Sequence, residues 1–195
     1  MSNIELLQHI VKEKGYITSK MAKEKNISSW FLTDMVNRSM LKRVGRGVYV
    51  TNEGVYDEYF IFQYRNSKAI YSFSNALYFH GLTDHIPSRL EVTVYQGYNA
   101  HRFDKNVIVH YVSKDIHQLG VIELISPNGN PIIVYDKERS LCDLVASKQV
   151  VESEVFKKAF QSYFRRVDKD VKKLMSYSVK IGIESEMFTL IEVLA

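Results

Sequence analysis

Basic side chains are concentrated in the first quarter of the chain, where they could contact the phosphate groups of a nucleic acid. Residues 1–50 contain nine Lys and Arg against four Asp and Glu, which gives a local net charge of +5. The rest of the chain contains 17 of the 26 basic residues and 18 of the 22 acidic residues, so its net charge is −1. Such an asymmetry indicates a binding face for an acidic partner more strongly than the total charge of +4 does.

Three of these cations lie in one short segment, LKRVGRGVYV, which spans residues 41–50. Two runs of strand-forming residues flank a Gly-Arg-Gly tip, and this pattern predicts a β-hairpin. Glycines on both sides of Arg46 would let the tip approach another backbone closely. An arginine in that place could enter a minor groove or clamp a phosphate, with Lys42 and Arg43 beside it. The alternative is an ordinary turn residue that happens to be charged.

Short polar side chains recur four residues apart just before this hairpin. Ser29, Thr33 and Asn37 would form one stripe of a helix, from which they could reach base edges in a major groove. Asp34 argues against a face that binds only phosphates, although a carboxylate can accept a hydrogen bond from cytosine. An ordinary solvated helix face is the alternative. Trp30 could serve as a core anchor or as a base contact, and the core anchor is the more common role of such a residue.

The elements that would position these residues follow from helix periodicity and capping. Apolar spacing and Ser or Thr caps predict helices over residues 3–13, about 19–25 and about 28–38. Two helices and a turn followed by a hairpin are the order of a winged helix-turn-helix, which we expect to occupy residues 1–52. The side chains expected to contact DNA are Lys20, Lys23, Lys25, Ser28, Ser29, Thr33, Asn37, Arg38, Lys42, Arg43 and Arg46.

The remainder of the chain is predicted to contain both helices and strands. A connecting helix is expected over residues 53–66, and SFSNALYFHGL reads as a further helical segment. The segments RLEVTVYQ, NVIVHYV, GVIELIS and PIIVYD are rich in branched residues and predict four strands. The last helices are expected to start at Asp136, to cover about 152–164, and to break at Gly182 within 168–195.

These elements define the expected fold class, which is α+β. An N-terminal winged helix-turn-helix would be followed by a mixed domain over residues 67–195. That domain would contain a mainly antiparallel sheet, because Asn128-Gly129 is a strong hairpin signal, and a group of C-terminal helices.

Residues that could catalyse a reaction or bind a metal are present but poorly arranged. The histidines show no metal-ligand spacing, and His80 falls on an apolar helical face, where a hydrogen-bonded core histidine is expected. Glu123, Asp136 and Glu138 could hold Mg²⁺ for phosphodiester cleavage. However, no lysine is placed convincingly between them, and Asp136 is explained as a helix cap. Cys142 lies on an apolar stripe as a buried small hydrophobe, so we expect no enzyme, metal or cofactor.

Composition limits where the protein would work. Hydrophobic residues make up 46% of the chain and charged residues 25%, which is ordinary for a globular protein. No apolar run approaches a membrane span, and the N-terminus lacks the apolar core of a signal peptide. A single cysteine excludes an internal disulfide. These features predict a cytoplasmic protein with no membrane partner.

Three sequence blocks resemble the AbiEi-type antitoxin family of bacterial abortive-infection operons, which act in phage defence. YITSKMAKEKNISSWFLTDMVNRSMLKRVGRGVYV is similar to the winged helix of that family. SNALYFHGLTDHIPSRLEVTV is similar to the segment that opens its second domain. DKERSLCDLV resembles a later Asp-x-x-Arg-x-Leu-Cys-Asp helix. The three blocks occur in the family's order over roughly residues 15–150.

The resemblance implies a protein with two roles. Its N-terminal domain would bind inverted repeats of double-stranded DNA in its own promoter and repress the operon. Its C-terminal domain would neutralise a nucleotidyltransferase-like toxin, AbiEii, without forming a stable complex, as in type IV toxin–antitoxin systems. We expect a monomer in solution, with two copies on each operator. Two other functions stay open: a transcriptional regulator whose C-terminal domain senses a small molecule, and a metal-dependent nuclease.

Overall fold

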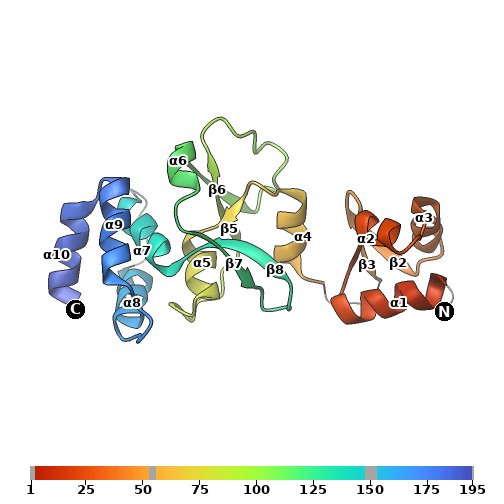
Figure 1. Ribbon diagram of the computed structural model, residues 1–195, viewed down its shortest axis with the longest axis horizontal. Coiled ribbons are helices and arrows are strands. Elements are labelled where there is room, and N and C mark those ends of the chain that lie inside the picture. The colour runs from red at the N-terminus through yellow and green to blue at the C-terminus, as the bar shows by residue number, and fades with distance from the viewer. Residues whose placement is uncertain (1–2, 53–55, 148–152, 195) are drawn as a thin grey trace. The chain divides into compact units, whose positions relative to one another are not determined.

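The computed structural model describes residues 3–52, 56–147 and 153–194 (Figure 1). The chain divides into two compact units. The first unit comprises Met1–Ser67 together with Ile125–Ile132, and the second comprises Lys68–Leu124 together with Ile133–Ala195. Both units combine helices with a sheet, so the protein has an α+β fold.

Three helices open the first unit: α1 (Asn3–Lys14), α2 (Ser19–Glu24) and α3 (Ser29–Asn37). The predicted caps are confirmed, because the Thr18 hydroxyl accepts from the Met21 amide at 3.1 Å and the Ser28 hydroxyl accepts from the Phe31 amide at 3.2 Å. Asn26 ends α2 with a positive φ of 59°. The three helices enclose a core of buried aliphatic side chains that includes Leu7, Ile17, Leu32, Met35 and Leu41.

A three-stranded antiparallel sheet completes this part of the chain. Its strands are β1 (Ile17–Thr18), β2 (Leu41–Gly45) and β3 (Val48–Thr51), in the order β1-β3-β2. The hairpin of β2 and β3 is the one that the sequence predicted. The register shifts between Arg43 and Gly45, which is a β-bulge just before the tip. Strand β1 was not predicted, because two residues are too few to show an alternating pattern.

Helix α4 (Glu58–Arg65) follows, and Asp57 caps it by accepting from the Phe60 amide at 3.0 Å. It is shorter than the helix expected over 53–66, of which residues 53–55 lie outside the described part of the chain. Ile61 packs in one cluster with Tyr16 and the β3 residues Val48 and Val50. The ring of Phe60 lies 4.3 Å from that of Tyr16, between centroids, so α4 belongs to the same unit as the hairpin.

The buried Asp57 side chain has a second role besides capping. Its Oδ2 atom accepts hydrogen bonds from the Ser126 hydroxyl and, at 3.0 Å, from the Asn130 side-chain amide. Both donors lie in the predicted turn, which closes through the Ser126 amide and the Asn130 carbonyl and holds Gly129 at a φ of +87°. This hydrogen bonding is why a turn far along the sequence belongs to the first unit.

The second sheet has five strands: β4 (Ile70–Tyr71), β5 (Leu90–Tyr95), β6 (Val107–Val112), β7 (Val121–Ile125) and β8 (Pro131–Tyr135). Their order is β6-β5-β4-β8-β7. The expectation of a mainly antiparallel sheet is wrong. Although β4 pairs antiparallel with β5, the pairs β4–β8 and β5–β6 are parallel, so the sheet is mixed. Residues 96–106 connect the adjacent strands β5 and β6, and this connection carries the chain back to the edge at which β5 begins.

Helices accompany this sheet: α5 (Phe73–Phe79), α6 (Lys114–His117), α7 (Lys137–Ala146), α8 (Ser153–Phe164), α9 (Val171–Ile181) and α10 (Glu184–Leu194). Asp136 caps α7 as predicted, and Gly182 separates α9 from α10 in a left-handed conformation. The last four helices pack together (Figure 1) around a core that includes Leu141, Phe160, Tyr163, Leu174 and Met187. Residue 152 of the helix predicted over about 152–164 lies outside the described residues.

None of the described helices is both long and apolar enough to cross a membrane.

Candidate nucleic-acid interface

All eleven side chains predicted to contact DNA lie in the first unit, and all are exposed. They come from three neighbouring elements. Helix α2 and its C-terminal end supply the three lysines, α3 with its two capping residues supplies the polar stripe and Arg38, and the β2–β3 hairpin supplies the remaining cations. These three elements thus belong to one compact unit, and their predicted contact residues are all exposed to solvent.

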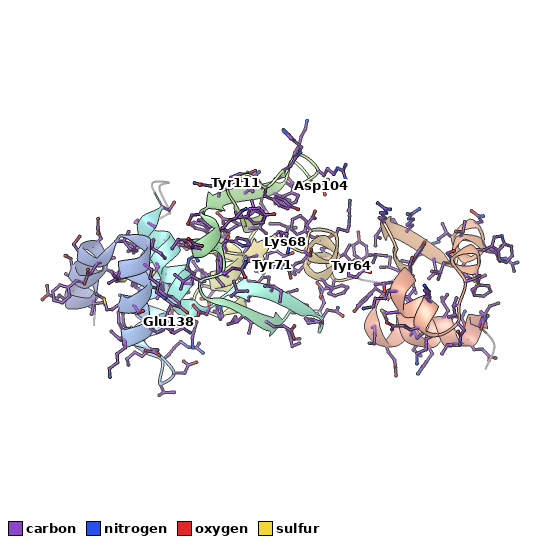
Figure 2. The ribbon with its side chains drawn as sticks, turned by 45° about the horizontal axis from the view of Figure 1, so that its top comes forward. Tyr64, Lys68, Tyr71, Asp104, Tyr111 and Glu138 are labelled. Atoms are coloured by element: carbon purple, nitrogen blue, oxygen red, sulfur yellow. The ribbon has the colours of Figure 1, made fainter. Side chains whose placement is uncertain are left out.

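Helix α3 carries an exposed aromatic side chain, Trp30. Trp30 is 71% exposed, so the interpretation as a core anchor is wrong. It is more exposed than Tyr64 on α4 (41%) and Tyr111 on β6 (49%), whose side chains are drawn in Figure 2. The buried residues of α3 are instead Leu32 and Met35.

Two of the predicted contact residues already have partners within α3. The Thr33 hydroxyl donates to the Ser29 carbonyl at 3.1 Å, so its hydrogen is used within the helix and its oxygen can still accept. The Arg38 guanidinium pairs with the Asp34 carboxylate at 2.9 Å, one helical turn earlier. An exposed pair of this kind contributes at most about 1 kcal/mol, so a phosphate can compete for Arg38.

The hairpin tip is fixed to the start of α2. The Ser19 amide donates to the Gly47 carbonyl at 2.8 Å, which joins the tip to the turn of helix that contains Lys20. Within the tip, Arg43 donates from Nε to the Gly45 carbonyl at 3.2 Å. Gly47 has a φ of +71°, which favours glycine. Arg46 is exposed between these constrained neighbours.

Gly45 lies directly against the exposed side chain of Arg65. A Cβ atom at this position would lie 2.6 Å from Cδ of Arg65, in the last turn of α4. At Gly47, a Cβ atom would lie 3.2 Å from the Ser19 hydroxyl. Gly47 therefore has a conformational reason within the fold, whereas a side chain at Gly45 would only displace the exposed side chain of Arg65. Neither glycine by itself indicates close approach to DNA.

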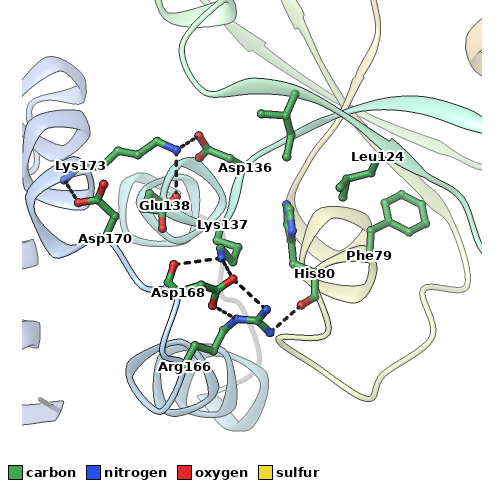
Figure 3. A pocket seen from close by; sticks show the side chains of 11 residues that line it. Phe79, His80, Leu124, Asp136, Lys137, Glu138, Arg166, Asp168, Asp170 and Lys173 are labelled. Atoms are coloured by element: carbon green, nitrogen blue, oxygen red, sulfur yellow. Dashed lines mark hydrogen bonds and ion pairs between the residues drawn. The ribbon is translucent and has the colours of Figure 1, made fainter.

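The second unit contains a polar cleft of about 570 Å³ beside the start of α7 (Figure 3). Its walls combine apolar residues of α5 and β7 with charged residues of α7, α9 and the segment between α8 and α9. Lys137 and Arg166 both bind Asp168, the second through its Nε atom at 2.7 Å. The charged groups that line this cleft are therefore paired with one another.

Lys173 lies between two of the acidic residues considered for a nuclease. Its Nζ atom is 2.8 Å from Oδ2 of Asp136 and 3.3 Å from Oε2 of Glu138, which contradicts our expectation that no lysine would lie there. Burial lowers the pKa of Lys173, but the hydrogen bond and charge of Asp136 and the charge of Glu138 outweigh this and raise it above its ordinary value. Lys173 follows Glu138 by 35 positions, so no local pattern could have revealed it.

The same acids have structural roles. Asp136 accepts from the Arg139 amide at 2.8 Å as the cap of α7, and Glu138 accepts from the Tyr163 hydroxyl at 3.0 Å. Glu123 is exposed on β7 and does not line the cleft. Across the described residues, no three His, Cys, Asp or Glu side chains gather as they would around a metal ion.

The other candidate reactive residues are explained by packing. His80 is hydrogen-bonded as predicted, with Nε2 at 2.7 Å from the Tyr135 carbonyl, and burial lowers its pKa. Cys142 is fully buried, and burial raises the pKa of its thiol to about 12. A thiol in this state is not a nucleophile at neutral pH.

Comparison with known proteins yields a relative in fold. No family model and no curated protein matches the chain. Among solved structures, the chain is similar to the RV2827C protein from Mycobacterium tuberculosis, with a TM-score of 0.54 and 11% sequence identity. The match covers 95% of this chain and 78% of that one. At this level of identity the similarity concerns the fold alone.

Proposed function

We propose that residues 1–52 form a winged helix that binds double-stranded DNA. The observation that carries the proposal is the arrangement of α3 and the β2–β3 hairpin. A helix with an uncharged outer stripe stands next to a hairpin whose cations are all exposed. A helix in the major groove with flanking cations on the phosphates is how helix-turn-helix proteins divide specificity from affinity.

Each group of side chains has its own task in this proposal. Ser29, Thr33 and Asn37 lie near base edges in the major groove. Phosphates are bound by the three lysines of the α2 region, by Arg38 and by the Ser28 end of α3. Arg43 and Arg46 act from the hairpin, against the neighbouring backbone or minor groove.

Salt dependence tests this division. If about six phosphates are neutralised, the logarithm of affinity should fall against the logarithm of salt concentration with a slope of about −5. The measurement is a titration of the full chain with its own promoter duplex between about 50 and 200 mM salt. An affinity that stays constant over this range contradicts the proposal.

We further propose that the chain is a cytoplasmic, non-enzymatic antitoxin that represses its own operon, in a type IV phage-defence system. The three sequence blocks of the AbiEi-type family support this role. In the proposal, the second unit neutralises a nucleotidyltransferase-like toxin without forming a stable complex. The protein is a monomer in solution and binds the inverted repeats of the operator in two copies.

Charge reversal in the hairpin separates the two roles. A variant with Lys42, Arg43 and Arg46 all replaced by Glu should lose promoter binding and repression. It should still rescue cells from the toxin encoded beside it, because the second unit is unchanged. Loss of rescue together with repression would contradict the assignment of the two activities to different parts of the chain. A neighbouring nucleotidyltransferase-like gene is the accompanying genetic observation.

A small-molecule sensor is the second candidate function, because the cleft beside α7 has a volume within the range of ligand sites. A metabolite that raises the melting temperature and also changes DNA affinity would favour the sensor. The nuclease requires metal-dependent DNA cleavage that Asp136→Ala abolishes. The mutual pairing of the charges in the cleft argues against both, since a ligand or a metal would have to displace a partner already bound.

A further inference from the structure

Trp30 is the single tryptophan of the protein and is 71% exposed. Tryptophan is highly buried on average, because exposing its ring to water is costly. Trp30 is the second residue of α3 and therefore lies in the first turn of that helix. In helix-turn-helix proteins, the N-terminal residues of the recognition helix contact base edges.

The position of Trp30 on the helix relates it to the predicted contact residues. Trp30, Thr33 and Asn37 are spaced i, i+3 and i+7, so they share one face of α3. All three are exposed and uncharged. Asp34 borders this face, but its carboxylate is held by Arg38 at 2.9 Å. The uncharged face of α3 therefore begins with the indole of Trp30. The lysines of the α2 region and the cations of the β2–β3 hairpin belong to the same unit.

We propose that Trp30 reads a thymine by packing its indole against the 5-methyl group in the major groove. This inference rests on the proposed binding of duplex DNA and specifies what α3 recognises there. Among the groups that base pairs present in the major groove, the thymine methyl is the apolar one. The flanking cations suit phosphates on both sides of that base pair, so charge complementarity commits the face to a nucleic acid.

The proposal divides the binding energy into two parts. Contacts from Lys and Arg to phosphates release counterions and depend steeply on salt. An apolar contact between an indole and a methyl group releases water but no ions. Trp30 should therefore contribute affinity that is independent of salt, and it should contribute only on duplexes with a thymine at one position.

Replacing thymine by deoxyuridine removes that methyl group and nothing else. The probe is the promoter duplex of the chain's own gene, with the bound segment located by footprinting and each thymine replaced in turn. Wild-type protein should bind about fourfold more weakly when the critical methyl is absent, the effect of one buried methyl group. Trp30→Ala should bind the normal duplex more weakly with an unchanged salt slope, and it should be indifferent to the same replacement.

The pair of substitutions forms a double-mutant cycle between protein and DNA. Trp30→Phe keeps an apolar ring and should retain part of the thymine preference. Phe188→Ala, which truncates a 54% exposed aromatic on α10, is the matched control and should leave every affinity unchanged. Equal losses for wild type and Trp30→Ala at every replaced thymine would overturn the inference. Failure of the wild-type protein to bind the normal duplex would instead overturn the proposed function.

Fluorescence gives an independent reading, because all tryptophan emission comes from this one side chain. Promoter DNA should shift the emission to shorter wavelength and protect it from iodide, and a duplex with the critical thymine replaced should protect less. An emission maximum and an iodide quenching that do not change when DNA binds would overturn the inference. So would a shift that depends on protein concentration without DNA, because a second copy of the chain would then cover the indole.

Discussion

At the residue scale, the two glycines at the hairpin tip differ from Arg46 between them, because a close neighbour or the backbone conformation constrains each glycine, whereas the Arg46 side chain is exposed. Gly47 has a left-handed backbone, which explains its identity by folding, and Gly45 lies against the Arg65 side chain. Arg46 is exposed, and neither a close neighbour nor a left-handed backbone explains its identity. The motif Gly-Arg-Gly suggested a single purpose for all three residues. The structure distinguishes the roles of these residues. The proximity of Gly45 to Arg65, twenty positions later, could not be predicted from any pattern in the sequence.

Arg46→Gln should weaken promoter binding and make the salt slope shallower by about 0.9, the loss of one phosphate contact. The melting temperature should not change, because the side chain is exposed. Lys14→Gln, in the exposed last turn of α1, removes the same charge and is the control. A slope that is unchanged by Arg46→Gln but altered by Lys14→Gln would move the contact from the hairpin to α1.

Asp34→Asn should strengthen binding to duplexes of unrelated sequence, because it removes a negative charge from the α3 face and frees Arg38 from its partner. The gain should disappear at high salt, where screening weakens both effects. Competition with unrelated DNA at two salt concentrations measures it. If Asp34 instead accepts from a cytosine, the same variant should lose affinity for the promoter alone.

At the element scale, local signals predicted every helix except the four-residue α6, and they predicted strand pairing poorly. Caps at Thr18, Ser28 and Asp136 and the break at Gly182 are encoded within a few residues, and the structure confirms each of them. The four long strands were also predicted as segments. Their partners depend on which strands the crossovers bring together, and that information is spread over the whole second unit. The short strand β4, which pairs with both β5 and β8, was therefore missed.

Ser28→Ala should reduce the free energy of unfolding by about 1 kcal/mol, because the amide of Phe31 loses its capping partner at the start of α3. Ser29→Ala, one position later in the first turn, should cost much less. Chemical denaturation of the two variants measures the difference. Equal costs would show that the cap contributes nothing beyond the removal of a hydroxyl group.

At the scale of the whole molecule, acid should destabilise the fold through the buried His117. Burial lowers the pKa of His117 below its ordinary value of 6.5, and its Nε2 atom lies 3.0 Å from the Lys68 carbonyl. The Gln118 side-chain amide lies 2.9 Å from Nδ1, which suits a neutral ring protonated at Nε2. The unfolded chain therefore takes up protons at a higher pH than the folded protein does.

The sign follows from this difference in proton uptake. The contribution of His117 to stability is complete above pH 6.5 and is lost as the pH falls through the lowered pKa of the folded state. His117→Gln keeps a donor for the Lys68 carbonyl and cannot titrate, so its stability should fall less between about pH 7 and pH 5. Asp143, whose pKa burial raises to about 6, acts in the opposite direction in both proteins and cancels in the comparison. Denaturant melts at several pH values measure the difference, and identical pH profiles would contradict it.

The hydrogen bonds of Asp57 affect where the N-terminal region could be cut and fused to another protein. Cutting after α4 keeps the helix and its capping contact with Phe60 but removes Ser126 and Asn130, which both donate to the same carboxylate oxygen. A fusion made at that position leaves Oδ2 of Asp57 to be hydrated by water, while Oδ1 still caps α4. Including residues 125–132 as a tethered segment would keep both donors.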